Sequence, residues 1–536
     1  MRDMPSDLAG KLYDVAIIGG GINGASAAQH LAAAGYSVLL VDKDDFGSGS
    51  SSRSSRLLHC GLRYLAPGRS AFDFVAHPGR FVNALKMARQ AMHARSEFIR
   101  TSSVRARPMR FCFPIFTDGP YATWQVNLAF RMLRALGPKD LPLDYRLISS
   151  REAATMPLVG GLRDFKQLIS VAVFREYQLD WPERICMDAA LDAERLGADI
   201  RNYTAARIVR RQGENWVLEL IPVDRPTEPT FVNARTVLNT SGIWIDDVTR
   251  KTTSAAKRRV FGTKGCHIVV KLPDDCSDIG IATLNSKQEP FYCIPWRGYH
   301  YFGPTETPFE GDADDVHVTR EERAWLIGEA NRMLPGLQLS DADVLMTWAG
   351  VRPLTYDENE PNGSRSRVIH DLAADGLPNV FAMTGGPVMS HRSAGRELAD
   401  LVAGRLSASG KPQTPSYEPR LLADNQNSPP LLDDHASIKL ADLRYAARDE
   451  HAHNLMDILF RRVGIGWECA LSDRELADAA DAVGQELGWD AARKKAEINV
   501  YRERAKVLFD PREKLRPIDF SHRVDLHQRG LDHVEE

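Results

Sequence analysis

The sequence predicts an α/β fold divided over more than one domain, and three observations support this. The chain has 536 residues, which is too long for one simple hydrophobic core. Residues 14–42 contain a strand, a glycine-rich turn, a helix and a second strand, the βαβ unit of a Rossmann-like domain. Residues 437–506 have a helical pattern and follow a proline-rich stretch at 411–430. We therefore expect a Rossmann-like domain near the N-terminus and a helical domain at the C-terminus.

The N-terminal unit contains every part of a βαβ unit in the expected order along the sequence. The β-branched, apolar run Asp14–Ile18 predicts a buried strand and leads directly into Gly19–Gly24, which reads GxGxxG. An alanine-rich helix is expected over about 25–34, and a second strand at 37–41 ends on Asp42. This order of strand, glycines, helix, strand and acid is far more specific than the glycine motif alone.

The glycines and the acid of this unit predict a bound dinucleotide. Gly19 permits the tight turn, Gly21 lets the backbone approach a pyrophosphate, and Gly24 lets helix and strand pack closely. The N-terminus of the helix adds N–H donors and a positive partial charge. Asp42 is placed to accept from a ribose hydroxyl, and an acid there disfavours a 2′-phosphate. FAD or NAD is therefore expected rather than NADP.

Two later segments favour FAD over NAD. The strand Thr236–Leu238 runs into a small-residue turn that ends on Gly242, as a distant segment does when it returns to a cofactor. Residues 377–406 show a strand, a Gly385-Gly386 turn and a long amphipathic helix, which supplies a late helix N-terminus for the isoalloxazine end. Either segment alone is also typical of an ordinary strand–turn–helix connection.

Several motifs give the chain a resemblance to a known family. They are YDVAIIGGGINGASAAQHLAAAGYSVLLVD, SSRSSRLLHCGLRYL, RPMRFCFP, KGCHIVV, IPW and WAGVRPL, between about Tyr13 and Leu406. Together they resemble the FAD-dependent glycerol-3-phosphate dehydrogenases, a branch of the D-amino-acid-oxidase-like flavoproteins. The combination of GGGING with HxGLRYL and GVRPL is much more specific than a Rossmann fingerprint.

The resemblance implies how the domains are arranged. It implies a Rossmann-like FAD-binding domain interleaved in sequence with a substrate domain on a mixed sheet, followed by a helical C-terminal domain. A capping box at Ser472–Glu475 predicts a helix in that last domain, ending near Gly488. The expected ranges are an FAD-binding core within 11–410 (about 11–90, 175–260 and 345–410), a substrate domain (about 91–174 and 261–344), a linker at 411–436 and the helical domain at 437–536.

The resemblance also implies a reaction: oxidation of a secondary alcohol by hydride transfer to flavin N5, with electrons passed to quinone or oxygen. The segment matching Ser51–Leu65 lines flavin and substrate in this family. Ser51, Ser52 and Gly61 are accordingly assigned to the cofactor, and the Arg63-Tyr64 pair to the substrate.

Further candidates are assigned by position in the family motifs. Arg352, in GVRPL, matches an arginine that holds the substrate phosphate, a task suited to its planar fork. Arg367 falls at the offset of a second family arginine, although Arg365 lies beside it. His267 matches a histidine suited to be the general base and His59 is the second candidate, while a structural role for His267 stays open.

Two positions depart from the family pattern and leave the substrate open. Cys60 stands where the family has glycine, and Pro387 stands where it has the lysine of Gly-Gly-Lys-Leu-Thr-Thr-Tyr-Arg. Proline has no donor, so the pocket becomes less cationic. The expected substrate is a small polyol phosphate. The alternatives are another anionic hydroxy or amino compound, or a flavin-binding protein that has lost catalysis.

Composition limits the remaining classes. The net charge of −3 argues against a nucleic-acid-binding protein, and seven cysteines without a CxxC pair predict reduced thiols and no metal site. With no apolar signal region or membrane span, a cytoplasmic protein is expected. The amphipathic stretch Tyr121–Leu136 leaves two interpretations open, a packed surface helix or peripheral contact with the inner face of a membrane. A homodimer also stays open.

Overall fold

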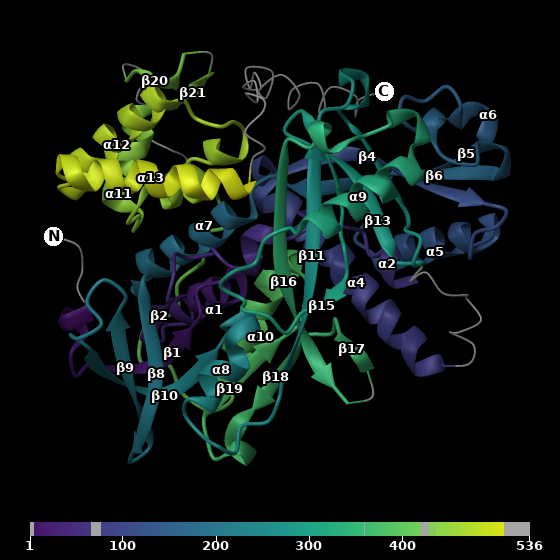
Figure 1. The fold of residues 1–536 in the computed structure, drawn as a ribbon. Helices are drawn as coiled ribbons and strands as arrows, with labels where there is room; N and C mark the ends of the chain where they lie inside the picture. The colour runs from purple at the N-terminus through teal and green to yellow at the C-terminus, as the bar shows by residue number, and fades with distance from the viewer. Residues whose placement is uncertain (1–4, 66–76, 359, 420–427, 434, 509–536) are drawn as a thin grey trace. The chain divides into compact units, whose positions relative to one another are not determined.

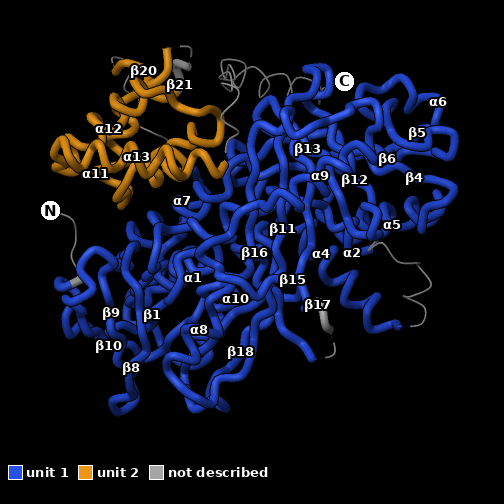
Figure 2. The backbone as a smooth tube through the Cα atoms, viewed as in Figure 1, with its two compact units in different colours: residues 1–419 blue, residues 420–536 orange. Residues whose placement is uncertain are grey.

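The computed structural model describes residues 5–65, 77–358, 360–419, 428–433 and 435–508. The chain divides into two compact units, residues 1–419 and 420–536, shown in Figure 2. The first unit contains both large sheets. The expected C-terminal domain at 437–536 falls in the second unit, and its last part, 509–536, lies outside the described residues.

The first sheet contains the expected βαβ unit. Among the described residues it has eight strands in the order β18-β19-β10-β1-β2-β7, with β9 paired to β10 and β8 to β9. β19, β10, β1, β2 and β7 run parallel, as in a Rossmann-like sheet. The strands are β1 (Leu12–Ile18), β2 (Val38–Val41), β7 (Asp199–Arg201), β8 (Thr204–Gln212), β9 (Asn215–Pro222), β10 (Thr230–Asn239), β18 (Val368–Asp371) and β19 (Val380–Thr384).

Helices α1 (Ile22–Ala33), α7 (Pro182–Arg195) and α10 (His391–Ala403) pack together beside this sheet (Figure 1). α1 is buried almost all round, which explains its run of alanines: small side chains allow two helices and a sheet to approach it at once. The short helix α8 (Ile245–Arg250) follows β10. Because β1 lies between β10 and β2 and α1 follows it directly, the first turn of α1 lies near the centre of the sheet.

The second sheet is larger and mixed. Over the described residues it has eleven strands in the order β17-β16-β11-β14-β13-β12-β4-β6-β3, with β15 paired to β11 and β5 to β6. Among its described strands, only β12 and β4 pair in parallel. The strands are β3 (Leu57–Leu58), β4 (Ala106–Phe116), β5 (Arg146–Ser149), β6 (Leu168–Leu179), β11 (Val260–Val270), β12 (Ile279–Leu284), β13 (Pro290–Trp296), β14 (Tyr299–Gly303), β15 (Thr307–Pro308), β16 (Met346–Asp357) and β17 (Glu360–Ser364).

The second sheet carries its own helices and core. Buried apolar residues of β6, β11 and β14 pack with those of helix α9 into one cluster. β11 and β16 form a long antiparallel ladder, and Figure 1 shows them as long neighbouring strands. The helices are α2 (Leu62–Leu65), α4 (Pro78–Ser102), α5 (Thr123–Leu136), α6 (Ser150–Ala153) and α9 (Arg320–Met333).

The chain visits the two sheets alternately, which confirms the expected interleaved fold. It forms β1–β2, then β3–β6, β7–β10, β11–β17 and finally β18–β19. The sheets differ from the expected ranges at β3, which falls in 11–90 but pairs with β6 of the second sheet, and at β16 and β17. β16 and β17 fall in 345–410, which was expected in the FAD-binding core, but β16 pairs with β11 from Val260↔Thr355 to Val269↔Met346. This long ladder places residues 346–364 in the second sheet.

Residues 411–419 open the expected linker but are held on the first unit. Gln413 N–H donates to Ala33 O (2.7 Å), Ser416 N–H donates to Asp192 Oδ2 (2.9 Å), and Ser102 Oγ donates to Tyr417 O (2.6 Å). These contacts hold residues 413–417 of the expected linker on the first unit.

The second unit is mainly helical among its described residues. Ser472 caps α12 and Glu475 completes the capping box, while Gly488 ends the helix at φ +68°, so this predicted helix is confirmed. A π-helical turn lies at Asp457–Arg462. The elements are β20 (Pro430–Leu432), β21 (His435–Lys439), α11 (Leu440–Asp449), α12 (Asp473–Leu487) and α13 (Ala491–Leu508).

Candidate active site

The glycine turn after β1 leaves no room for side chains at two of its positions. Gly19 has φ +104°, and a Cβ there would stand 2.6 Å from Ser241 Cα. A Cβ on Gly24 would stand 1.9 Å from Gly19 O. Thr240 Oγ1, at the end of β10, donates to Gly19 O at 2.8 Å. The turn is thus locked between α1 and β10, which requires glycine at both positions.

The first turn of α1 faces the cavity and is supported from Ser51–Leu65, which we call the polar segment. Gly21 is the N-cap, and a Cβ there would meet only Ser51 Oγ, at 3.3 Å. Ser51 Oγ accepts from the N–H of Ile22 at 3.0 Å, so one of the free donors of the helix is already satisfied. The helix end still supplies the positive partial charge that favours a phosphate.

Asp42 lies at the end of β2, where the sequence places the ribose acceptor. Its carboxylate accepts from the N–H of Gly20 (2.7 Å) and of Asp44 (2.9 Å). Burial raises its pKa to about 7, against the effect of these two donors, and Asp44 and Asp45 raise it further. A hydroxyl that donates to Asp42 would therefore favour the ionised carboxylate.

A cavity of about 770 Å³ joins these elements. Its volume is within the usual range for a small-molecule site, about 300–1,000 Å³. The glycine turn and the α1 terminus lie on it together with segments from β10, β16 and the turn after β19. Of the residues assigned to the cofactor from sequence, the cavity is lined by Gly19, Gly21, Asp42, Ser51, Gly242, Gly385 and Gly386.

The residues present fit FAD. The cradle at Gly19 and Gly24 excludes even a methyl group, the α1 terminus faces the cavity, and an acid stands at the end of β2. Ser52 and Gly61, also assigned to the cofactor, do not line the cavity and contact other parts of the protein. Ser52 Oγ donates to Ser48 O (3.1 Å) and Gly49 O (3.0 Å), and a Cβ on Gly61 would stand 2.9 Å from Ala88 Cα of α4.

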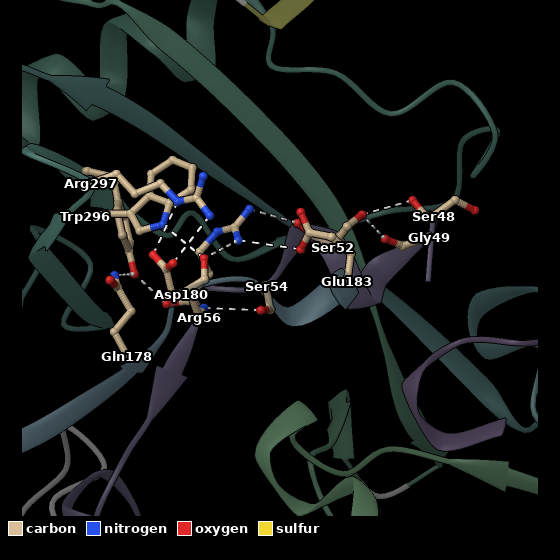
Figure 3. Close-up of polar contacts among 12 residues, drawn as sticks. Ser48, Gly49, Ser52, Ser54, Arg56, Gln178, Asp180, Glu183, Trp296 and Arg297 are labelled. Atoms are coloured by element: carbon tan, nitrogen blue, oxygen red, sulfur yellow. Dashed lines mark hydrogen bonds and ion pairs between the residues drawn. The ribbon is translucent and has the colours of Figure 1, made fainter. Parts of the chain in front are cut away.

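The polar segment beyond the cavity holds an arginine that is completely buried. Arg56 has φ +55° and lies 3.6 Å from Glu183, and neither side chain is exposed. Its guanidinium also stands over Trp296, 4.5 Å from the ring centroid, and donates to Ser52 O at 3.4 Å. Figure 3 shows Arg56 reaching toward Glu183 and Ser52, with Asp180 and the tryptophan on its other side. The network fixes the segment between cofactor cavity and second sheet.

His267 lies on β11 next to this network. Its ring stacks on Trp348 with 4.8 Å between centroids, and its Nε2 lies 3.0 Å from Ser55 Oγ. Its Nδ1 is buried and has no hydrogen-bond partner among the described residues. Burial lowers the pKa of His267 well below its usual value, and the charges of Arg352 and Arg56 lower it further. The imidazole is therefore neutral near pH 7.

Arg352 is placed by β16 beside that histidine. A Cβ on Gly265 would stand 2.2 Å from Arg352 Nη2, so the guanidinium lies directly on this glycine. Both of its terminal nitrogens donate to Thr305 O at 3.4 Å. Pro353, the next residue, lines the cofactor cavity. The side chain of Arg352 itself does not line the cavity, and it lies within electrostatic range of His267.

A four-residue charged cluster, Arg63, Arg352, Arg365 and Glu306, forms around this position. Arg365 forms an ion pair with Glu306, and Gly386, on the cavity wall, donates its N–H to Arg365 O at 3.2 Å. Burial alone would raise the pKa of Glu306, but Arg365, Arg352 and Arg63 together hold it below its usual value. Burial and Arg63 lower the pKa of Arg365 to about 10. Tyr292 lies close enough to influence all three arginines.

The structure does not bring Arg367 into this cluster. Its guanidinium donates to Glu397 Oε2 (2.8 Å), Ser390 O (3.2 Å) and Ser393 Oγ (3.1 Å), at the start of α10. The chain bends at Ser366, whose carbonyl accepts from Thr355 Oγ1 at 2.8 Å. The bend separates the two arginines, so that Arg365 and not Arg367 lies in the charged cluster.

His59, Tyr64 and Cys60 belong to the same short segment. The rings of His59 and Tyr64 meet edge to face at 5.4 Å, and burial followed by Arg63 lowers the pKa of His59 to about 3. Cys60 is fully buried and its N–H donates to both carboxylate oxygens of Glu176 at 2.9 Å. Burial raises the pKa of its thiol, so this cysteine is an unreactive core residue.

Pro387 follows the two glycines of the cavity wall. Gly385 and Gly386 both have positive φ, and a Cβ on Gly385 would stand 2.3 Å from Ser366 O. Pro387 then starts a short 3-10 turn and offers no donor. Arg392, in the helix that follows, donates to Thr101 Oγ1 and Ser102 Oγ (2.6 and 2.7 Å) and therefore fastens α10 to α4.

Sequence reasoning missed Glu306, Arg365 as a cluster member, and the burial of Arg56. Arg365 had a signal, because it stands two residues before the family position. Glu306 follows Thr305 in the loop after β14, and no pattern near it indicates a charged site. Arg56 reads as a solvated arginine in a serine-rich loop.

Two family models and several known proteins match this chain. Residues 14–401 match the family described as FAD dependent oxidoreductase, and residues 418–494 match the C-terminal domain of alpha-glycerophosphate oxidase. A glycerol-3-phosphate dehydrogenase of Synechocystis sp. is 30% identical over 426 residues, which are 77% of this chain and 73% of that protein. An aerobic glycerol-3-phosphate dehydrogenase of Staphylococcus aureus is 29% identical over 402 residues, 74% and 67% of the two chains.

A solved structure has a similar fold. It is the glycerol-3-phosphate dehydrogenase from Bacillus halodurans complexed with FAD, with a TM-score of 0.67 and 19% identity. The similarity covers 95% of this chain and 98% of that one.

Proposed function

The chain belongs to the FAD-dependent oxidoreductases, in the branch of the FAD-dependent glycerol-3-phosphate dehydrogenases, and we propose that it oxidises the secondary hydroxyl of a small polyol phosphate such as glycerol 3-phosphate. It is an FAD-dependent enzyme that acts on a CH–OH group. The observation that carries the proposed substrate is the charged cluster beside His267: three arginines and one carboxylate suit a dianionic phosphate.

The proposed cofactor contacts follow the cavity wall. The α1 terminus with Gly19 and Gly21 would hold the pyrophosphate, and Asp42 the ribose. The backbone of Gly242, Gly385 and Gly386 would lie against the flavin end. Bound FAD supplies the acceptor for the hydride that leaves the substrate carbon.

The side chains of the cluster would bind and orient the substrate. Arg352 and Arg365 would bond phosphate oxygens, with Arg63 and Tyr64 beside them. His267 would accept the hydroxyl proton at Nδ1, the ring nitrogen without a partner among the described residues. Its lowered pKa keeps it neutral, as a base requires. His59, with a pKa near 3, is suited to packing rather than to proton transfer.

Pro387 supports a second candidate class of substrate. The position lacks the cationic side chain of the family pattern, so a less cationic ligand, an anionic hydroxy or amino compound, also suits this pocket. The same departure is the one observation that favours a flavin-binding protein without catalysis. The four-residue charged cluster favours the polyol phosphate over both.

Electron transfer onward is proposed to use quinone or oxygen, at or near the inner face of a membrane. None of the helices among the described residues is long and apolar enough to cross a membrane. α5 exposes Trp124 (64%) and Leu128 (43%) beside the exposed Arg131 and Arg134, a face suited to anionic lipid. Co-sedimentation with anionic vesicles tests this contact, and gel filtration with light scattering tests the proposed homodimer.

Two matched arginine variants test the substrate proposal. Arg352→Met should lower kcat/KM for glycerol 3-phosphate roughly 30- to 5,000-fold, a loss of about 2–5 kcal/mol in transition-state stabilisation, because a half-buried charged partner of the phosphate is lost. Arg367→Met removes the same group outside the cluster and should change kcat/KM less than about threefold. Both variants should keep FAD. Equal losses in both, or none in Arg352→Met, would reject the proposed anion site.

A further inference from the structure

The charged cluster contains one acid, Glu306, and only one of its two carboxylate oxygens has a hydrogen-bond partner among the described residues. Glu306 Oε1 pairs with Arg365, while Oε2 accepts no hydrogen bond from any described residue. The side chain is 26% exposed and no described donor occupies Oε2, which leaves this oxygen for a ligand. Its neighbour Thr305 holds Arg352 through the carbonyl, which fixes the position of the acid relative to both arginines.

We infer that Glu306 is a specificity-determining residue that accepts a hydrogen bond from a substrate hydroxyl other than the one that is oxidised. This inference rests on the proposed function, and it defines the substrate class more closely: an anion that carries at least two hydroxyl groups. The oxidised hydroxyl must face His267, so a second donor is available for Oε2. A phosphate with a plain alkyl tail leaves Oε2 unpaired.

The charges explain why an acid is placed among cations. Three guanidinium groups and one carboxylate leave two net positive charges, which balance a phosphate dianion. Arg63, Arg352 and Arg365 all favour the charged form of Glu306, so its carboxylate stays ionised at neutral pH. An ionised carboxylate accepts hydrogen bonds but donates none, so it binds a hydroxyl or ammonium and repels a second anionic group.

The expected discrimination follows from the kind of hydrogen bond. A bond to a charged group contributes about 1.5–3 kcal/mol, roughly 10- to 150-fold in affinity. The wild-type holoenzyme should therefore bind 3-hydroxypropyl phosphate at least about tenfold more tightly than propyl phosphate. The two compounds differ in one terminal hydroxyl, and neither contains a secondary hydroxyl to oxidise.

The test measures both dissociation constants by the change in flavin absorbance of the oxidised holoenzyme, with inorganic phosphate as a third ligand. In Glu306→Ala the ratio between the two alkyl phosphates should fall to about one, because the acceptor is gone, while phosphate should bind at least as tightly as before. Glu306→Gln keeps the shape and should reduce the ratio partly. Glu310→Ala removes an exposed acid (80% exposed) and should leave the ratio unchanged.

The outcomes separate the inference from the proposed function. An undiminished ratio in Glu306→Ala, or a ratio near one in the wild type, would overturn the role of Glu306 while the anion site stands. If the wild type binds neither inorganic phosphate nor either alkyl phosphate, the proposed anion site fails and the inference fails with it. If Glu306→Ala does not retain FAD, Glu306→Gln decides by the same ratio.

Discussion

Removing the guanidinium of Arg56 should destabilise the protein more than most single substitutions. Arg56 and Glu183 are both fully buried with 3.6 Å between the charged atoms, and Arg56 also stands 4.5 and 5.5 Å from the ring centroids of Trp296 and Trp348. Arg56→Met leaves the Glu183 carboxylate buried without its cation. Breaking one side of a buried pair costs about 3–5 kcal/mol, and we expect that loss in the free energy of unfolding.

The double variant separates the ion pair from simple packing. Arg56→Met/Glu183→Gln removes both charges and should be more stable than Arg56→Met alone, by about 1–3 kcal/mol. Urea unfolding of the FAD-loaded protein, followed by tryptophan fluorescence, measures all three proteins because two of the reporting rings lie on the Arg56 network. A loss below about 1 kcal/mol in Arg56→Met, or strictly additive losses, would refute the reasoning.

The pH dependence gives an independent check. Burial raises the pKa of Glu183 and Arg56 lowers it, so removing Arg56 raises that pKa further in the folded protein. A carboxyl whose folded pKa is raised contributes stability that is fully present below its unfolded pKa, about 4.3, and is lost as the pH rises. The difference between wild type and Arg56→Met should therefore shrink as the pH falls from 7 toward about 4.5. A difference that widens over this range would contradict the assignment.

Three further predictions address the cofactor, the histidines and the substrate. Gly24→Ala should abolish FAD binding, because its Cβ would stand 1.9 Å from Gly19 O. As the control, a Cβ at Gly328 in α9 meets nothing within 4 Å, so Gly328→Ala should keep FAD and add about 0.5–1 kcal/mol of stability. The flavin-to-protein absorbance ratio measures FAD binding and urea unfolding measures stability. Burial lowers the pKa of His300 to about 4, so below about pH 6.5 the unfolded chain binds a proton that the folded chain does not. The free energy of unfolding therefore falls as the pH falls, and His300→Gln should reduce this slope by about 1.4 kcal/mol per pH unit between about pH 6 and 4.5. An unchanged slope would contradict this prediction. Pro387→Lys adds an ammonium next to the cavity wall and should raise kcat/KM for glycerol 3-phosphate about tenfold, while an unchanged value would show that this position does not tune substrate choice.

The local parts of this fold could be predicted from sequence because local chemistry determines them. The βαβ unit needs glycine at Gly19 and Gly24 for steric reasons that any fold of this kind repeats. The α12 cap uses side chains three residues apart, and Gly488 ends the helix where φ is positive. Such signals lie within one helix or one turn.

Long-range pairing was harder to predict. β16 joins the second sheet through a ladder to β11, and its partners lie more than 70 residues away in the sequence. The choice between Arg365 and Arg367 depends on a bend at Ser366 that a tertiary hydrogen bond stabilises. Glu306 follows β14, whereas its arginines come from α2, from β16 and from the segment after β17, so no local pattern can reveal it. Resemblance supplied Arg63 and Arg352, and the structure supplied their partners.

Anaerobic reduction of the bound flavin with a panel of pure compounds tests the central proposal most directly. The panel contains glycerol 3-phosphate and other polyol phosphates, hydroxy acids and amino acids, and each is mixed with the oxidised holoenzyme while the visible flavin absorbance is recorded. We expect bleaching with a polyol phosphate and none with amino acids. Bleaching by amino or hydroxy acids without any response to polyol phosphates would contradict the account.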